Sequence, residues 1–269
     1  MMIINRFVIK HKIMGGKSMK SIFFRLSVGI GLVALVSAVG VQSTLAAQSV
    51  TFGFEPGMVT NVVMQDNTLL EAAPNLNRGT FGSLQWSDAP GDERRVIWQI
   101  SNDFTNHIPA GESIISATLK FVNLVSQSAT TGSVYRMLKP WAETTTTWIN
   151  QDTTGPTAWS SPGLGIGTDV ASSPFISNQA FPAVSPLSIH AFNITGELQF
   201  WRSNPSSNYG IAFIAALNSP EVSWGDVNRA DASGTEKPRL EVVYTPEPSA
   251  GLLGGVGLVM LLRRRRPRA

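Results

Sequence analysis

Short runs of β-branched and aromatic residues, separated by glycine, proline, asparagine and serine, recur between residues 48 and 244. No long segment in this region has the apolar periodicity of a helix. The clearest runs are 95–100, 117–125, 133–138, 189–194, 209–217 and 239–244. Many short strands at this spacing predict an all-β fold, an antiparallel β-sandwich of the jelly-roll type.

The pattern inside these runs predicts which residues face the core. In 95–100, Val96, Trp98 and Ile100 alternate with other residues and should share one buried face. The run 210–217 is almost continuously apolar, which indicates a central strand buried on both sides. One short helix is expected after residue 194, with Thr195 as its cap.

The charge map excludes several classes of protein. The chain carries a formal net charge of +3, yet residues 48–245 contain 10 basic and 17 acidic residues and are therefore acidic at −7. Nucleic-acid binding is not expected, because that affinity depends on clustered lysine and arginine. The sequence has no cysteine, so it has no disulfide, cysteine-based metal site or cysteine nucleophile.

The N-terminal segment, residues 1–47, has the features of an extension followed by a secretory signal peptide. Basic residues precede an apolar stretch at 26–41, and small residues follow it, so cleavage by a signal peptidase is expected after Ala46 or Ala47. Translation can start at Met1 or Met19, and the sequence leaves both starts open. The segment is predicted to be a helix before its removal.

The C-terminal segment, residues 245–269, combines three elements in a fixed order. Pro246-Glu247-Pro248 precedes a short apolar stretch at 250–262, and four consecutive arginines follow: Arg263, Arg264, Arg265 and Arg266. Thirteen apolar residues give a helix of about 20 Å, shorter than a bilayer core, and the arginines should stay on the cytoplasmic side. A weak membrane anchor is one interpretation. The order also resembles the PEP-CTERM sorting signal, which implies recognition by an exosortase after transient inner-membrane association, in a Gram-negative bacterium that makes extracellular polysaccharide.

Several blocks of the body, in order, resemble the DNRLRE (disaggregatase-related) family, which includes carbohydrate-binding modules. An aspartate-containing block at 65–68 precedes the turn 75–79, where Arg78 stands in place of the usual aromatic residue. The later matching blocks are 94–101, 108–119, 141–148, 194–210 and 238–244. The resemblance covers most of 48–244, taken as one domain, and implies a β-sandwich that binds polysaccharide. It supplies no catalytic residues.

Candidate ligand-binding residues follow from sugar chemistry, because pyranose rings stack on exposed aromatic faces. Trp159 lies in a stretch rich in proline and glycine and is the first candidate platform, followed by Trp86 and Trp224 beside loops. Arg136 and Arg229 are candidates to bind acidic or hydroxyl groups of a polysaccharide. Each tryptophan can equally be a core residue that holds a loop in place.

Two further hypotheses concern a metal and a reaction. Asp226, Asn228 and Asp231 lie in an oxygen-rich segment that is a candidate calcium site, with a solvated loop as the alternative. Glu143 and His190 are the side chains that an enzyme would use, but Glu143 has no adjacent carboxylate partner, as glycoside hydrolysis requires. A polysaccharide lyase in which His190 transfers a proton together with Tyr135 or Tyr209 is a weaker hypothesis.

The sequence therefore predicts a secreted, non-catalytic protein of the cell surface or extracellular matrix, anchored in the membrane until its tail is processed. Its expected partners are an extracellular polysaccharide and, during export, signal peptidase and an exosortase. The alternatives are a structural biofilm protein without sugar affinity and, less favoured, a polysaccharide lyase or hydrolase. The identity of the polysaccharide, the oligomeric state and the fate of the tail do not follow from the sequence.

Overall fold

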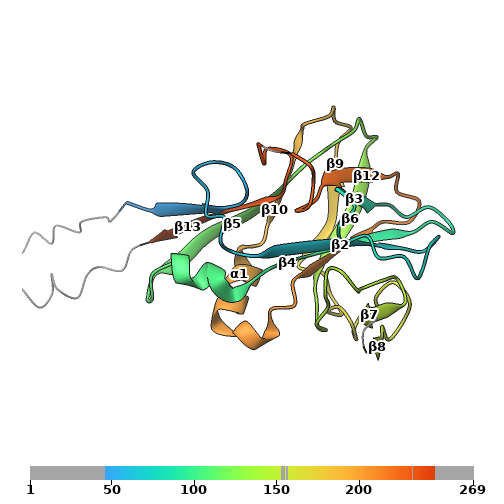
Figure 1. Cartoon of the computed structure of the whole chain (residues 1–269), viewed down its shortest axis with the longest axis horizontal. Coiled ribbons are helices and arrows are strands. Elements are labelled where there is room, and N and C mark those ends of the chain that lie inside the picture. Colours follow the sequence, from blue (N-terminus) through green and yellow to red (C-terminus); the bar gives the residue numbers. More distant parts are fainter. Residues whose placement is uncertain (1–45, 153–154, 156, 232, 246–269) are drawn as a thin grey trace, which may run out of the picture. The chain divides into compact units, whose positions relative to one another are not determined.

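The computed structural model describes residues 46–152, 155, 157–231 and 233–245 (Figure 1). This part of the chain is built mainly from antiparallel strands. One sheet has four strands in the order β1 (Gln48–Phe52), β13 (Arg239–Thr245), β5 (Ser113–Val122) and β10 (Ile189–Asn193). The other has five in the order β2 (Met64–Leu70), β4 (Arg94–Ile100), β11 (Ile211–Ala215), β6 (Thr130–Arg136) and β9 (Ile176–Phe181). The all-β prediction is confirmed.

Two short strand pairs and three short helices complete the described part. The pairs are β3 (Ser83–Trp86) with β12 (Val222–Gly225) and β7 (Asn150–Asp152) with β8 (Thr157–Ala158). The helices are η1 (Asn102–His107), α1 (Thr195–Ser203) and η2 (Pro205–Ser207). Among the described residues, no helix combines the length and the apolar character needed to cross a membrane. The predicted signal and C-terminal helices lie outside these residues.

Helix α1 confirms the predicted helix but corrects its cap. The N-cap residue is Ile194, which has no capping side chain, and Asn193 Oδ1 accepts from the backbone N–H of Thr195 at 3.0 Å. Thr195 Oγ1 instead accepts a hydrogen bond from the backbone N–H of Ala117 at 2.8 Å and donates one to Asn193 Oδ1 at 2.6 Å. The threonine therefore ties the start of the helix to β5, while Leu198 and Trp201 bury its inner face.

The main core lies between the two large sheets and is formed by alternating residues of their strands. Val96, Trp98 and Ile100 of β4 are fully buried there, as predicted, together with Leu119 and Phe121 of β5. Burying one large apolar side chain stabilises a fold by roughly 1.5–3 kcal/mol. Alternation along β4 and β5 therefore fixes which faces of the two sheets meet.

A second apolar cluster, called here the loop cluster, occupies the opposite face of the five-stranded sheet. Its buried members are Leu69, Ile97, Met137, Trp141, Trp148, Trp159, Leu164, Val170 and Ala212. Ile97 and Ala212 alternate with main-core residues of β4 and β11, and residues 139–170, which contain β7 and β8, cover them (Figure 1). Strand β11 is thus central and buried on both sides, which confirms the prediction for 211–215; residues 216–217 follow the strand, and Leu217 is exposed.

The first and last strands of the described part are neighbours. Gln48 of β1 pairs with Tyr244 of β13, and Thr245 at the end of β13 pairs with Ser113 at the start of β5. Strand β13 lies between β1 and β5, so it is an internal strand of its sheet. Both ends of the described chain consequently leave from the same end of the four-stranded sheet (Figure 1).

Candidate functional sites

The three tryptophans predicted to form a sugar platform are buried. The exposed fractions are 1% for Trp86, 0% for Trp224 and 4% for Trp159. Trp224 stacks on Phe121 with ring centroids 4.7 Å apart, and Trp86 stacks on Trp224 at 5.6 Å. Trp159 belongs to the loop cluster, where its Nε1 donates to the carbonyl of Thr147 at 3.0 Å. The prediction of exposed platforms is therefore corrected, because each ring is covered by its neighbours.

His190 is part of the main core rather than of a cleft. Its Nδ1 accepts a hydrogen bond from Trp224 Nε1 at 2.9 Å, and its ring lies 4.9 Å from that of Phe181. Burial lowers the pKa of His190 to about 4, so the imidazole is neutral near pH 7. Tyr135 and Tyr209 pack against the loop cluster on the other face of the five-stranded sheet. The structure does not bring together the pair that the lyase hypothesis requires.

Arg136, at the end of β6, separates two small surface cavities. Its Nε and Nη2 donate to the two carboxylate oxygens of Glu197 at 2.6 and 3.0 Å, and its guanidinium lies 3.6 Å from the ring centroid of Phe200. The cavity on one side, about 220 Å³, includes Phe175 and Ser173; the other, about 150 Å³, includes Tyr209 and Leu138.

The Arg136 site offers two kinds of contact to a ligand. The Glu197 side chain is almost fully buried, whereas 29% of the Arg136 side chain is exposed. A bidentate pair of this kind holds the guanidinium rigidly, and its remaining N–H groups can donate to hydroxyl or carboxylate oxygens. Phe175 and Tyr209 are partly exposed aromatic rings beside it. We refer to Arg136, Phe175, Glu197, Phe200 and Tyr209 as the Arg136 site.

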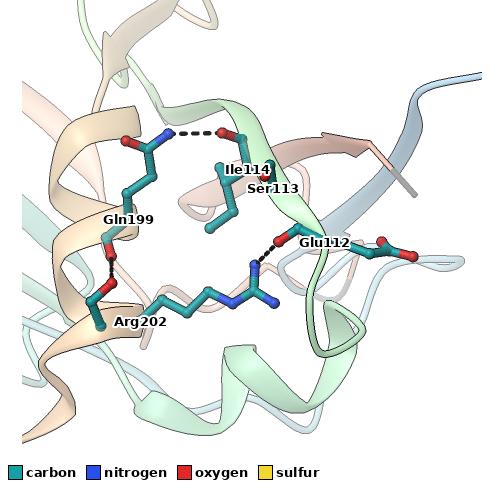
Figure 2. A pocket seen from close by; sticks show the side chains of 6 residues that line it. Glu112, Ser113, Ile114, Gln199 and Arg202 are labelled. Carbon is teal, nitrogen blue, oxygen red and sulfur yellow. Dashed lines mark hydrogen bonds between the residues drawn. The ribbon is translucent and has the colours of Figure 1, made fainter. Parts of the chain in front are cut away.

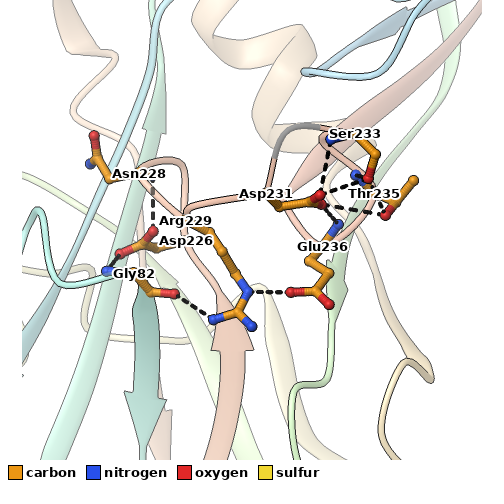
Figure 3. A network of polar contacts seen from close by, with 8 residues as sticks. All are labelled: Gly82, Asp226, Asn228, Arg229, Asp231, Ser233, Thr235 and Glu236. Atoms are coloured by element: carbon orange, nitrogen blue, oxygen red, sulfur yellow. Dashed lines mark hydrogen bonds and ion pairs between the residues drawn. The ribbon is translucent and has the colours of Figure 1, made fainter.

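Arg229 and the predicted calcium ligands belong to the polar network of residues 226–236 (Figure 3). Arg229 forms an ion pair with Glu236 and donates to the carbonyl of Gly82 at 3.3 Å. Its guanidinium therefore fixes the loop against the strand pair that begins at Ser83.

The carboxylate oxygens of the predicted calcium site already accept hydrogen bonds that stabilise two separate turns. Asp226 accepts from the backbone N–H groups of Gly82 at 2.7 Å and Asn228 at 2.9 Å. Both Asp231 oxygens accept bonds from residues 233–236, and this lowers its pKa to about 2 (Figure 3). Within the described ranges, no three histidine, cysteine, aspartate or glutamate side chains converge in a metal-binding arrangement. Asp226, Asn228 and Asp231 therefore do not fit a shared calcium ion.

Three carboxylates from distant segments, Asp66, Glu143 and Asp226, form a group that the sequence did not indicate, in which Asp66 and Asp226 are buried and Glu143 is partly exposed. Glu143 Oε1 accepts from the backbone N–H of Asp66 at 3.2 Å and from Asn228 Nδ2 at 3.1 Å. Asp66 Oδ2 accepts from the N–H of Val227 at 3.0 Å, while Oδ1 is buried without a hydrogen bond from the described residues. Burial raises the pKa of Asp66 well above its usual value, and the charges of Asp226 and Glu143 raise it further.

The residues of this carboxylate group connect blocks that carry the sequence resemblance. The side-chain amide of Asn67 donates to the carbonyls of Glu143 and Thr146 at 3.2 and 2.9 Å, and that of Asn77 donates to both at 2.7 Å. These bonds join 65–79 to 141–148. The Glu143 carboxylate itself links this segment to β2 and to the 226–228 turn.

A further cavity of about 210 Å³ lies between the start of β5 and the last turn of α1 (Figure 2). Its lining residues are Glu112, Ser113, Ile114, Gln199, Arg202 and Ser203. Arg202 donates to the backbone carbonyls of Glu112 and, at 2.7 Å, Pro109. Among the described residues no carboxylate forms an ion pair with Arg202.

No protein-family model matches the chain, and no curated protein matches it. The sorting residues Pro246, Glu247, Pro248 and Arg263–Arg266 lie outside the described part, as does the signal peptide.

Proposed function

We propose that this protein is exported to the cell surface or matrix of a Gram-negative bacterium, where it binds polysaccharide without catalysing a reaction. The export part rests on the signal-peptide pattern of 1–47 and on the ordered tail Pro246-Glu247-Pro248, apolar stretch and four arginines. The tail is proposed to be a PEP-CTERM signal that an exosortase recognises at the inner membrane. Removing both basic ends would leave the acidic domain of 48–244.

The proposed domain type is a jelly roll related to the DNRLRE family. Leaving aside β2, the sheet orders are β1-β13-β5-β10 and β4-β11-β6-β9. The chain passes between these sheets from β4 to β5 to β6, and again from β9 to β10 to β11 to β13. Such crossing between two four-stranded sheets is what a double Greek key requires. The contacts between 65–79 and 141–148 support the family assignment, because two of the resembling blocks meet.

The observation that carries the binding proposal is the Arg136 site. Sugar recognition needs hydrogen-bond donors in a fixed orientation beside an apolar ring face, because a pyranose presents hydroxyl groups around an apolar surface. Arg136 is held by Glu197 and by Phe200, and Tyr209 and Phe175 lie in the cavities on its two sides. Because both cavities adjoin the guanidinium of Arg136, they suit two consecutive sugar units of one polysaccharide chain.

A structural matrix protein without sugar affinity is the alternative that one observation favours. All seven tryptophans are buried or nearly so, which is what packing, rather than sugar stacking, would select. A polysaccharide lyase or hydrolase is third, because Glu143 and His190 have separate partners and Glu143 serves backbone and amide donors.

Affinity electrophoresis of the chain from Gln48 onward, in mild detergent, through gels that contain neutral or acidic polysaccharides tests the binding proposal. Ser173 is exposed and lines one cavity beside Arg136, so Ser173→Trp should block the site and abolish retardation while the fold remains. Ser128→Trp, at an exposed serine away from both cavities, is the matched control. Equal retardation of the two variants, or none for the parent chain, would refute binding at this site.

The sorting proposal has a separate test in the producing bacterium. A chain that lacks 246–269 should be lost from the surface or matrix fraction, whereas Glu247→Gln tests the motif without removing the apolar stretch. Surface display of the truncated chain at the parent level would contradict a sorting role for the tail.

A further inference from the structure

The strongest unassigned feature is the pair formed by Arg78 and Phe81, in the loop between β2 and β3. The guanidinium carbon of Arg78 lies 3.7 Å from the centroid of the Phe81 ring. Phe81 is 62% exposed, so the ring face away from the guanidinium is open. No other aromatic side chain among the described residues is exposed to this degree. An open ring of the kind that sugar stacking requires is therefore present, although it is not one of the tryptophans.

The positive charge of Arg78 has no paired carboxylate. Among the described residues, none accepts a hydrogen bond from its three side-chain nitrogens and none forms an ion pair with it. Nε and Nη2 are buried, which leaves Nη1 as the accessible donor. Burial and the charge of Arg94 lower the pKa of Arg78 from its usual value, so the charged form is destabilised in this position. An anion bound at Nη1 would offset that destabilisation.

The carboxylates whose charges act on Arg78 already have other partners. Glu221 and Asp92 both form ion pairs with Arg94, at 2.5 and 2.6 Å. Asp226 accepts hydrogen bonds from two backbone N–H groups (Figure 3). These three charges raise the pKa of Arg78, in part against the effect of burial, but none of the three side chains donates or accepts a hydrogen bond with it. The acceptor that this guanidinium lacks must therefore come from a ligand.

The turn that carries the two side chains is anchored at several backbone positions. The N–H of Arg78 donates to Asn67 Oδ1 at 3.2 Å, and the carbonyl of Gly79 accepts from Asn228 Nδ2 at 2.8 Å. Gly82 is held through both its N–H and its carbonyl (Figure 3). A Cβ at Gly79 would overlap the backbone beneath it, so the turn lies tightly on the domain. Side chains fixed in this way lose less entropy when a ligand binds.

We propose that Arg78 and Phe81 form a second binding site, which takes a polyuronate: a carboxylate pairs with Arg78 Nη1, and the ring of an adjacent sugar unit packs on the open face of Phe81. The phenyl face favours a sugar over an acidic peptide, because a pyranose presents an apolar face beside its charged group. This inference extends the proposed function, since it adds an acidic polysaccharide as ligand on a surface other than the Arg136 site.

Calorimetric titration tests the second site in the Ser173→Trp background, where the Arg136 site is blocked. The protein is the chain from Gln48 onward in mild detergent, and the probes are an oligogalacturonate and an oligomannuronate. Each probe is compared with its methyl ester, which keeps the sugar rings and removes the charge. At least one oligouronate should bind about tenfold more tightly than its ester, as expected for a charge-assisted hydrogen bond.

Two variants with matched controls assign the binding to the two side chains. Arg78→Gln should weaken oligouronate binding about tenfold, whereas Lys139→Gln, which removes one positive charge at an exposed lysine after β6, should leave it unchanged. Phe81→Ala should weaken binding about fivefold through the loss of stacking. Val63→Ala, at an apolar residue that is also 62% exposed, is its control. Circular dichroism and the Tm confirm that each variant is folded.

The outcomes separate this site from the Arg136 site. The second site is overturned if neither oligouronate binds, if Arg78→Gln and Phe81→Ala leave the affinity unchanged in folded protein, or if an oligoglutamate binds equally well. In neutral gels Ser173→Trp should abolish retardation, and in acidic gels it should leave a part that Arg78→Gln removes. If Ser173→Trp has no effect in neutral gels while oligouronates bind through Arg78, the Arg136 site fails and the second site stands. If it abolishes retardation in both kinds of gel, the reverse holds.

Discussion

The main core and the loop cluster lie on opposite faces of the same five-stranded sheet, and they differ in how the indole N–H groups of their tryptophans are hydrogen-bonded. In the main core Trp86, Trp98 and Trp201 bury Nε1 without a hydrogen-bond partner from the described residues. In the loop cluster Trp141 Nε1 donates to the carbonyl of Tyr209 at 2.8 Å, and Trp159 Nε1 donates to that of Thr147 at 3.0 Å.

The difference follows from what covers each face. The four-stranded sheet covers the main core, and its backbone groups are already paired in the ladder, so they offer few free acceptors to an indole N–H; the main-core indole of Trp224 donates to a side chain instead, that of His190. Residues 139–170 cover the loop cluster with little regular structure, so their carbonyls need other donors. Trp159 supplies one such donor to the carbonyl of Thr147, and Trp141, itself in this segment, donates to the carbonyl of Tyr209 before β11. The tryptophans of the loop cluster thus both fill space and anchor an irregular backbone.

The largest effect should come from truncating a main-core indole. Trp98→Ala leaves a cavity between the two sheets and should lower the free energy of unfolding by about 3–5 kcal/mol. Urea unfolding followed by circular dichroism should show one cooperative transition at a much lower midpoint. A loss below about 1 kcal/mol would mean that the sheets are not packed through this residue.

Trp159→Ala should cost less, about 2–3 kcal/mol, because the covering segment can relax into the space. Its characteristic result should be local opening: limited proteolysis should cut within 139–170 under conditions where the sheets remain folded. Trp159→Phe keeps most of the apolar volume but loses the bond to Thr147, and should cost only about 1 kcal/mol. Cleavage elsewhere first would argue against a separable loop cluster.

Two glycines permit a matched comparison through added volume. A Cβ at Gly132 of β6 would overlap the Trp86 ring, and one at Gly163 would overlap the Trp148 ring. Overpacking typically costs about 1–3 kcal/mol. Gly132→Ala should fall at the upper end, since two sheets enclose Trp86. Gly163→Ala adds the strain of a positive φ, but the segment that covers the loop cluster can shift to relieve the overlap. Its main effect should therefore be faster proteolysis within 139–170, with only a small decrease in Tm. Thermal melts with parallel digestion distinguish the two.

The main core could be predicted from the sequence because its signal is local. Val96, Trp98 and Ile100 alternate within six residues, and the apolar run at 210–217 marked the central strand. Residues 150–187 lack a continuous apolar pattern, yet they contain β7, β8 and β9; residues 226–238 lack it too and contain the turns after β12. Those strands are short or at a sheet edge, so they lack a continuous apolar pattern.

The sites were less predictable because they depend on pairs distant in sequence. Arg136 was identifiable as a cation, but its partner Glu197 is 61 residues away, and only the pair makes a rigid donor. The prediction for Trp159 relied on the composition of the loop around it. The sheet face that Trp159 covers is formed by Ile97 and Ala212, which are distant from it in sequence. Asp66 and Glu143 are 77 residues apart, and no local signal joins them.

The smallest effect concerns pH and tests whether polar contacts anchor the loop cluster. The pKa of Asp66 is raised in the folded state by burial and by Asp226 and Glu143. A carboxyl group with a raised folded pKa stabilises the fold below its unfolded pKa, and this contribution is lost as pH rises through the folded value. The Tm should therefore decline as pH rises above the ordinary aspartate pKa of about 4, with proteolysis in 139–170 increasing as it does so.

Asp66→Asn should flatten that decline, because the variant has no proton to lose at this position. Part of the slope should remain, since the pKa values of Glu143 and Asp226 are also raised by burial. Asp231→Asn is the opposite control: its pKa is lowered to about 2 by bonds within its own turn, so its contribution should be lost only as pH falls from about 4 towards 2. An unchanged slope in Asp66→Asn, with the same proteolysis profile, would show that the loop cluster is held by its indoles and not by the carboxylate group.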